Sequence, residues 1–313
     1  MADSRIEIFA PDGIGEVVGG TDLAALVAPY VEDGDVVVIT SKVVSKAEGR
    51  VRAGEREQAI REETVRVVAR RGPTSIVETR LGVVMAAAGV DASNVEAGSV
   101  VLLPEDPDAS ARTIRERLAV AHGVDVAVVV SDTAGRAWRH GQTDLAIGVA
   151  GLLPLESFAG RTDAYGNPLA VTAPAVADEI AGVAEVASGK LGHRPVTVVR
   201  GLADRVLPRG EHGPGARALV RETGTDMFGL GSREAVVAAL GGRDRHAFGA
   251  PAAPDELVQA LEACGVPARV EGELVTAGSG REDLRIVALA FAHGWQAVAD
   301  ESTDSTTVLA VLS

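Results

Sequence analysis

The stretch VDVAVVVSDTAGRAWRHGQTD, residues 124–144, joins a strand-like run to a dense group of polar side chains. Its first seven residues are almost continuously apolar and rich in valine, which is typical of a strand buried on both faces of a sheet. The next fourteen residues carry three hydroxyls, two aspartates, two arginines, a histidine and a glutamine. Because ligands of α/β proteins gather outside strand ends, this junction indicates a functional site.

The composition of the 313-residue chain narrows the class of protein. With 46% hydrophobic residues the chain can bury a large core. A net charge of −14 argues against nucleic acid and anionic membranes as partners, although a bound cation could still recruit an anionic substrate. The single cysteine, Cys264, excludes an internal disulfide and a cysteine metal cluster. Without a long apolar run or a signal-like N-terminus, we expect a soluble, cytoplasmic protein.

Apolar runs alternate with amphipathic patterns along the chain, which predicts an α/β (α+β) fold with several buried strands. Strands are expected at 35–40, 75–79, 99–103, 124–130 and 195–201, and helices at 21–31, 55–71, 108–123 and 174–192. The helix at 108–123 is expected to start near Ser110. Neither a P-loop nor a dinucleotide-binding glycine motif follows any of these strands.

A cluster of Gly, Pro and Ala near residue 245 predicts a boundary between a domain at 1–245 and a small α/β appendage at 246–313. The appendage contains one helical pattern at 255–264 and strand-like runs at 284–292 and 306–312. It is small for an independent domain, so we expect it to pack on the first domain or on a second subunit.

Hydroxyls and two lysines, Lys42 and Lys46, follow the predicted strand at 35–40. Such groups suit phosphate oxygens, but an ordinary helix cap explains the hydroxyls equally well. The chain has only one other lysine, Lys190, against 27 arginines among its 30 basic residues. Two lysines in one segment therefore indicate a need for compact ammonium groups there, unless the spacing is chance.

Asp132, directly after a buried strand, can ligate a hard cation such as Mg²⁺ or Mn²⁺, which often joins a carboxylate to nucleotide phosphates. Arg136 and Arg139 could face anionic substrate groups, and Gln142 and Asp144 could orient them. The alternative is that Asp132 forms a turn that caps a following helix. His140 is interpreted as a solvated side chain.

Six segments occur in order: GIGEV (13–17), DGDVVVITSKVVSKAEGR (33–50), ETRLGVVMAAAGVDASNV (78–95), SDTAGRAWRHGQTDLAIGVAG (131–151), YGNPL (165–169) and AVADEIA (175–181). Together they resemble the coenzyme F420-0:L-glutamate ligase family, which also forms the N-terminal half of an actinobacterial bifunctional enzyme. The resemblance covers roughly residues 5 to 230.

The resemblance implies a mixed-sheet, F420 ligase-like fold in an intertwined homodimer. It implies GTP- and metal-dependent attachment of L-glutamate to F420-0, with Mn²⁺ or Mg²⁺, through an acyl phosphate, and possibly addition of further γ-linked glutamates. The residues that match the family's nucleotide-binding positions are Ile14, Gly15, Glu16, Val17, Ser41, Lys46 and Gly135. Asp132 matches a metal ligand, and we expect Asp132 and Lys46 to be the catalytic residues.

The chain departs from the family pattern where relatives carry a second acidic metal ligand, because it has Ala173 and Pro174 there. Asp163, Asp178 or Glu179 could replace that ligand. The appendage is too short for the flavin-binding domain of the bifunctional enzyme, so no flavin is expected. Two alternatives remain open: a nucleotide-binding regulatory homologue without catalysis, and an acid–amine ligase for another phosphorylated acceptor.

Overall fold

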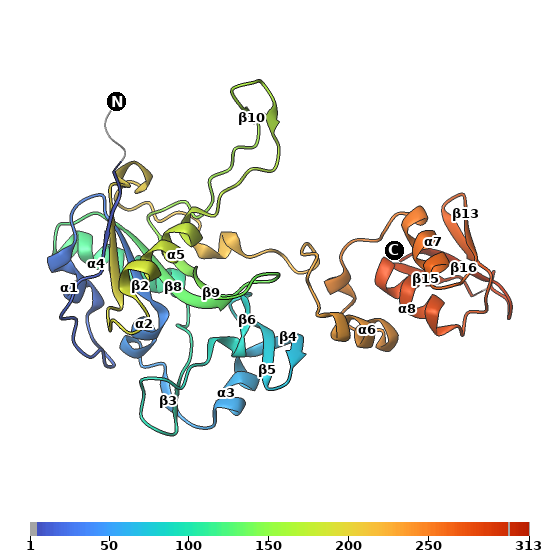
Figure 1. The fold of residues 1–313 in the computed structure, drawn as a ribbon, viewed down its shortest axis with the longest axis horizontal. Coiled ribbons are helices and arrows are strands. Elements are labelled where there is room, and N and C mark those ends of the chain that lie inside the picture. The colour runs from blue at the N-terminus through green and yellow to red at the C-terminus, as the bar shows by residue number, and fades with distance from the viewer. Residues whose placement is uncertain (1–4, 300, 313) are drawn as a thin grey trace. The chain divides into compact units, whose positions relative to one another are not determined.

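A computed structural model describes residues 5–299 and 301–312, which form two compact units. The first unit comprises Met1–Arg66 and Ile76–Val220, and the second comprises Val67–Ser75 and Arg221–Ser313 (Figure 1). The expected boundary near residue 245 falls inside the second unit.

A five-stranded sheet with strand order β1-β12-β2-β8-β9 forms the centre of the first unit. Its strands are β1 (Glu7–Phe9), β2 (Val36–Thr40), β8 (Ala127–Gly135), β9 (Gln142–Ala150) and β12 (Val196–Arg200). Only β2 and β8 are parallel, and the other three pairs are antiparallel. The predicted mixed α/β architecture is confirmed.

Helices cover both faces of this sheet, so the valine runs of β2 and β8 are buried throughout. One core cluster joins α1 (Leu23–Val27), α2 (Ser41–Ala47) and α4 (Pro107–Ala121) to the side chains that alternate toward their face, such as Ile39 and Val130. The other joins α5 (Val176–Ser188), which covers the opposite face of the sheet (Figure 1), to side chains such as Val38 and Val129. The two faces therefore follow the twofold alternation of strand side chains.

Side-chain caps fix where two helices on the first face begin. Asp22 accepts hydrogen bonds from the backbone of Ala24 and Ala25 and so starts α1. Asp106 accepts from Ala109, and Pro107 occupies the first turn of α4, so this helix starts before the predicted Ser110. The Asp106–Pro107 pair, and not Ser110, therefore sets the start of α4.

Short elements lie between or after the strands of the central sheet along the chain. They are β3 (Val51–Ala53), α3 (Arg56–Glu63), β4 (Thr64–Arg71), β5 (Thr74–Thr79), β6 (Val84–Ala86), β7 (Ser99–Val101), β10 (Arg161–Thr162), β11 (Pro168–Leu169) and the 3₁₀ turns η1 (Ala28–Tyr30), η2 (Ala87–Gly89), η3 (Ala203–Arg205) and η4 (Ala216–Leu219). They pair as β3-β7, β4-β5-β6 and β10-β11.

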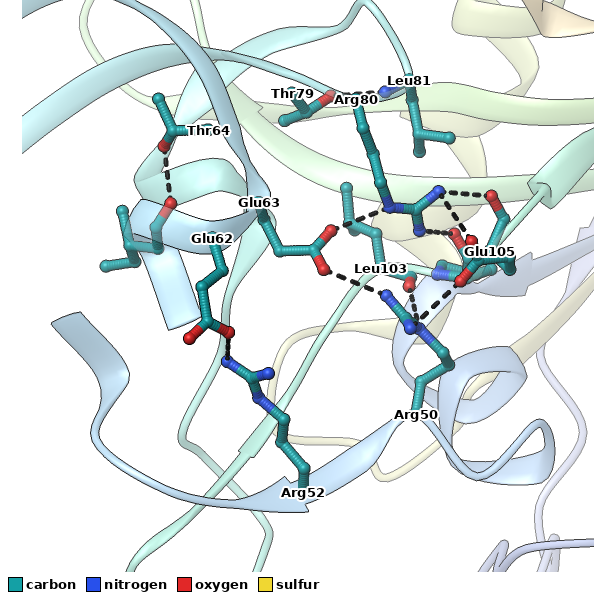
Figure 2. Close-up of polar contacts among 12 residues, drawn as sticks. Arg50, Arg52, Glu62, Glu63, Thr64, Thr79, Arg80, Leu81, Leu103 and Glu105 are labelled. Carbon is teal, nitrogen blue, oxygen red and sulfur yellow. Dashed lines mark hydrogen bonds and ion pairs between the residues drawn. The ribbon is translucent and has the colours of Figure 1, made fainter. Parts of the chain in front are cut away.

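The long helix predicted over 55–71 is wrong: α3 ends at Glu63 and β4 follows. Figure 2 shows the polar contacts at the junction, where Glu63 accepts hydrogen bonds from Arg50 and Arg80 at 3.2 and 2.9 Å. The Thr64 hydroxyl donates to the Ile60 carbonyl, 2.6 Å away. The β-branched residues after Thr64 then favour a strand, which leaves Val65 on the surface instead of on an inner helical face.

The second unit contains α6 (Ser232–Gly241), η5 (Arg245–Phe248), α7 (Pro254–Ala263), α8 (Leu284–His293) and a four-stranded antiparallel sheet. The sheet order is β13-β14-β16-β15, with β13 (Ala268–Glu271), β14 (Leu274–Ala277), β15 (Trp295–Ala297) and β16 (Thr307–Val311). Its core includes Trp295, which is 1% exposed, and Leu309.

The strand expected at 284–292 is wrong, because these residues form α8. The Asp283 side chain accepts from the Arg285 backbone and caps the helix, while Gly294 ends it in the left-handed conformation. The Ile286 and Ala290 side chains, four residues apart, are both buried, which is helical spacing. Apolar length alone could not separate the two structures.

Candidate active site

A cavity of about 640 Å³ opens at one edge of the central sheet in the first unit. At this edge Thr40 of β2 pairs with Ser131 of β8, and the Thr40 backbone donates to the carbonyl of Pro195, just before β12. Three neighbouring strands therefore bring their polar ends to one place, which is where α/β sheets bind ligands. The cavity therefore lies at the strand ends from which the sequence pattern predicts a site, and its role stays a prediction.

All three lysines of the chain line this cavity. Lys46 forms an ion pair with Glu16, 2.7 Å between Nζ and Oε1, and its hydrogen bond lowers the pKa of Glu16. Lys42 pairs with Asp91 at 2.6 Å. Lys190, which the sequence did not assign to the site, lines the same cavity. The scarcity of lysine in the sequence was the one feature that could have pointed to Lys190, because all three lysines lie around the same cavity.

The predicted nucleotide-binding residues divide into two groups. Ile14, Gly15, Glu16, Val17 and Lys46 all line the cavity. Ser41 and Gly135 are not among the residues that line it. Ser41 is buried as the first residue of α2, and Gly135 is exposed at the end of β8.

Asp132 lies within β8 and not after it, because the strand continues to Gly135 and pairs with β9 as far as Gln142. The alternative that Asp132 caps a following helix is therefore excluded by the strand pairing. The Ser41 hydroxyl donates to the Asp132 carboxylate over 2.7 Å. Asp132 itself does not line the cavity, whereas its neighbours Ser131 and Asp144 do.

The surroundings of Asp132 oppose its ionisation. Burial raises the pKa of its carboxyl from 3.8 to about 6, and the negative charges of Asp144 and Asp91 add to this rise. The hydrogen bond from Ser41 acts in the opposite direction and is outweighed. A carboxylate held close to others and short of positive partners is well suited to receive a cation.

Asp144 is a buried carboxylate at the sheet edge. It is 6% exposed and accepts hydrogen bonds from the hydroxyls of Ser131 and Thr133, each at 2.8 Å. Ser131 and Thr133 alternate with Asp132 along β8, so Asp144 and Asp132 lie on opposite faces of the strand. The Lys190 ammonium donates to the Thr133 hydroxyl over 3.0 Å and extends this chain of contacts.

The side chains predicted to contact substrate lie at the tip of the β8–β9 hairpin. Arg136, Arg139 and Gln142 are all exposed there, as is His140, which was interpreted as a solvated side chain, and none of the four lines the cavity. Arg136 donates to the carbonyl of His140 at 3.2 Å. The structure therefore does not bring these residues together with Lys46, and their predicted role is untested.

A hard cation fits the oxygen donors at Asp132 and Ser41 by chemistry, since Mg²⁺ and Mn²⁺ prefer carboxylate and hydroxyl oxygens. Within residues 5–299 and 301–312, no three His, Cys, Asp or Glu side chains form a ready ligand set. A cation bound at Asp132 would therefore take much of its coordination from substrate oxygens and water.

The proposed replacements for the missing ligand have other partners. Asp178 accepts from the Ala146 backbone at 2.8 Å, and burial raises its pKa. Asp163 accepts from the backbone of Tyr165 and Asn167 and organises the β10–β11 turn. Glu179 is exposed, as is Ala173. None of these residues lines the cavity.

Comparison with known proteins identifies relatives over most of the chain. A family model described as F420-0:Gamma-glutamyl ligase matches residues 54–201. The coenzyme F420:L-glutamate ligase of Archaeoglobus fulgidus is 41% identical over 221 residues, which are 63% of this chain and 88% of that protein. The protein of the same name from Methanopyrus kandleri is 40% identical over 67% of this chain and 92% of its own length. The protein of the same name from Halobacterium salinarum is 42% identical over 61% of this chain and 85% of its own length.

One further property concerns membranes. Within the described part of the chain, none of the helices combines the length and the apolar character needed to cross a bilayer.

Proposed function

Because the chain belongs to the F420-0:gamma-glutamyl ligase family, we propose that it joins L-glutamate to coenzyme F420-0 at the expense of GTP. The observation that carries this proposal is the cavity at the sheet edge, which is lined by all three lysines and by residues 14–17. The chain that forms this cavity aligns with 88% of the length of the Archaeoglobus fulgidus ligase. An acidic protein that places its few ammonium groups around one cavity is suited to anionic substrates.

Lys46 and the 14–17 segment are assigned to the nucleotide. The Lys46 side chain is only 12% exposed, so its ammonium interacts with a ligand in a poorly solvated place, where charge attraction is stronger. Its partner Glu16 is 76% exposed and can turn away when phosphate oxygens compete for the ammonium. Gly15 has open space around its Cβ position, so backbone groups there can approach a ligand closely.

Asp132, positioned by Ser41, is assigned to a divalent cation, Mn²⁺ or Mg²⁺. When bound, such a cation offsets phosphate charge and polarises a phosphoryl oxygen. A metal titration followed by thermal unfolding tests the assignment without activity. Mn²⁺ is expected to raise the melting temperature of the wild type and not that of Asp132→Asn, and an equal rise in both would contradict it.

The chemistry proceeds through an acyl phosphate in this proposal. A carboxylate oxygen of F420-0 attacks the γ-phosphorus of GTP, and GDP leaves. The amine of glutamate then attacks the acyl carbon, phosphate leaves, and the amine loses a proton. Lys46 stabilises the charge that develops on the phosphoryl oxygens, which is the main contribution a protein makes to phosphoryl transfer.

Mass spectrometry of F420-0 incubated with protein, GTP, glutamate and Mn²⁺ tests the proposal. We expect a product heavier by one glutamyl residue, with further glutamyl additions if the enzyme extends the chain. Replacing GTP with ATP, and omitting each component in turn, establishes nucleotide selection and the need for each substrate. Unchanged F420-0 in the complete mixture would contradict a ligase.

The absence of acidic side chains at Ala173 and Pro174 favours a second candidate, a nucleotide-binding regulatory homologue without catalysis. It predicts GTP binding with no glutamate-dependent GTP hydrolysis. A third candidate, an acid–amine ligase for another phosphorylated acceptor, predicts GTP turnover only with that acceptor. The homodimer implied by the family resemblance is tested by light scattering of the purified protein.

A further inference from the structure

Lys190 differs from the other two lysines of the cavity in its electrostatic partners. Lys42 and Lys46 each have a carboxylate within 2.7 Å. Arg194, also in the cavity wall, has Asp12 at 2.6 Å. Among the described residues, no carboxylate lies within ion-pair distance of Lys190. In a chain with 44 acidic and 30 basic residues, an unpaired ammonium facing a cavity is suited to an anionic ligand.

The backbone holds Lys190 at the cavity. Gly189 ends α5 with a positive φ of 66°, and the chain turns toward β12 over the next residues. The turn leaves no room for a side chain at Gly192, where a Cβ would collide with the carbonyl of Ser188. Pro195 closes the segment by accepting a hydrogen bond from Thr40 at 3.0 Å. The segment 189–195 is thus held by α5 at its start and by β2 of the sheet at its end.

A hydrogen-bonded chain orients the Lys190 side chain. Its ammonium donates to the Thr133 hydroxyl at 3.0 Å, and that hydroxyl donates to the buried Asp144 carboxylate at 2.8 Å. An ammonium group has three N–H donors, and this contact uses one of them. The remaining donors are available to a ligand that enters the cavity.

Lys190 and Lys46 reach the cavity from different layers of the fold. Lys46 lies on α2, whose core is on one face of the sheet, whereas Lys190 follows α5, which covers the other. In the proposed function Lys46 serves the nucleotide, which leaves Lys190 for one of the two other anionic substrates, F420-0 or glutamate. Bringing the substrates together in one cavity is what a ligase requires.

We propose that Lys190 binds the phosphodiester group of the acceptor, across the cavity from the nucleotide site at Lys46. This inference rests on the proposed function and adds a binding residue for the acceptor. Besides the carboxylate, which must lie beside the transferred phosphate, the acceptor F420-0 carries a phosphodiester, and this second anionic group suits the ammonium of Lys190. Arg194, which is paired with Asp12, and His193 line the same wall.

The test measures steady-state kinetics of Lys190→Ala with F420-0 and with GTP varied in turn. Loss of one charge-assisted contact predicts an increase in the KM for F420-0 of about tenfold to a hundredfold. The KM for GTP is expected to stay within about twofold. Lys190→Arg, which keeps the charge, is expected to restore most of the acceptor affinity.

Arg112→Ala is the matched control, since it removes one positive charge from an exposed position on α4 outside the cavity wall. It is expected to leave both KM values unchanged. An F420-0 derivative with a methyl-esterified carboxylate separates the two anionic groups in a binding titration. Its affinity is expected to fall in Lys190→Ala as that of F420-0 does, because the phosphodiester is retained.

The outcomes separate the two proposals. If product forms but the acceptor KM of Lys190→Ala equals that of the wild type, or if the GTP KM rises instead, the Lys190 assignment is wrong and the ligase assignment stands. If only the unesterified acceptor loses affinity, Lys190 contacts the carboxylate and the assignment is again wrong. If F420-0 binds without turnover, the ligase assignment fails, and the binding titration still decides the role of Lys190.

Discussion

Replacing Asp132 with asparagine is expected to stabilise the protein at neutral pH in the absence of metal. The carboxylate is partly buried, and its pKa of about 6 lies well above the ordinary 3.8. Asparagine keeps an oxygen that can accept the 2.7 Å hydrogen bond from Ser41. The asparagine side chain lacks the negative charge that the nearby Asp144 and Asp91 disfavour at position 132. The substitution therefore changes the electrostatics with little change in shape.

The direction of the pH effect follows from which state binds more protons. Between pH 4 and 6, approximately, Asp132 is protonated in the folded protein and ionised in the unfolded chain. The free energy of unfolding therefore falls as pH rises through this window. A pKa of Asp132 that is about two units above its ordinary value corresponds to a loss of about 3 kcal/mol in the free energy of unfolding above pH 6. Because the side chain is partly exposed, solvent screening brings the expected loss to about 1–3 kcal/mol.

Urea unfolding of both proteins with a chelator, at several pH values from 4 to 7.5, measures this effect. We expect the Asp132→Asn protein to be more stable above pH 6 by about 1–3 kcal/mol, and the difference to shrink toward pH 4. Asp204→Asn, which removes one charge from an exposed position in the same unit, should show no such window. A stability difference between wild type and Asp132→Asn that is the same at every pH would refute the argument.

Three further substitutions test other parts of the structure. Lys46→Ala is expected to weaken GTP binding about tenfold to a hundredfold by calorimetry, and unchanged affinity would exclude Lys46 as a phosphate contact. Glu63→Ala removes one of the two acidic side chains that Arg50 and Arg80 share, the other being Glu105, and should lower the free energy of unfolding by about 2 kcal/mol, whereas the exposed Glu57→Ala on the same helix should change it little. Gly148→Ala places a Cβ against the carbonyl of Pro107 and should destabilise by about 1–3 kcal/mol in chemical unfolding; a neutral result would mean that α4 can shift away from β9.

The sequence predicted elements well where pattern and composition agree. The valine runs of β2 and β8 are buried on both faces, as their continuous apolar character indicated. It predicted poorly where local propensity was outweighed by tertiary contacts. The helix over 55–71 is cut at Glu63 by two arginines that lie 13 residues before and 17 residues after it in the chain. Contacts between residues this far apart in the sequence do not alter the hydrophobic periodicity from which a helix is predicted.

The candidate site was predicted in part for a similar reason. Lys46 follows a predicted strand, so the strand-end rule placed it near this edge, whereas only the family resemblance linked residues 14–17 to it; the structure brings both to one cavity. Lys190 follows a helix, and only the packing of α5 over the sheet brings it to the same cavity. Asp132 was expected beyond a strand end, and strand pairing with β9 instead keeps it inside the ladder.

The clustering of the lysines has a practical consequence for chemical modification. Every side-chain primary amine of this protein lines one cavity, because the chain's only lysines are Lys42, Lys46 and Lys190. Apart from the N-terminus, an amine-specific acylating reagent therefore has a single region in which to react. The extent of labelling, read by mass spectrometry, would report directly on whether that region is covered, without any need to engineer a probe into it.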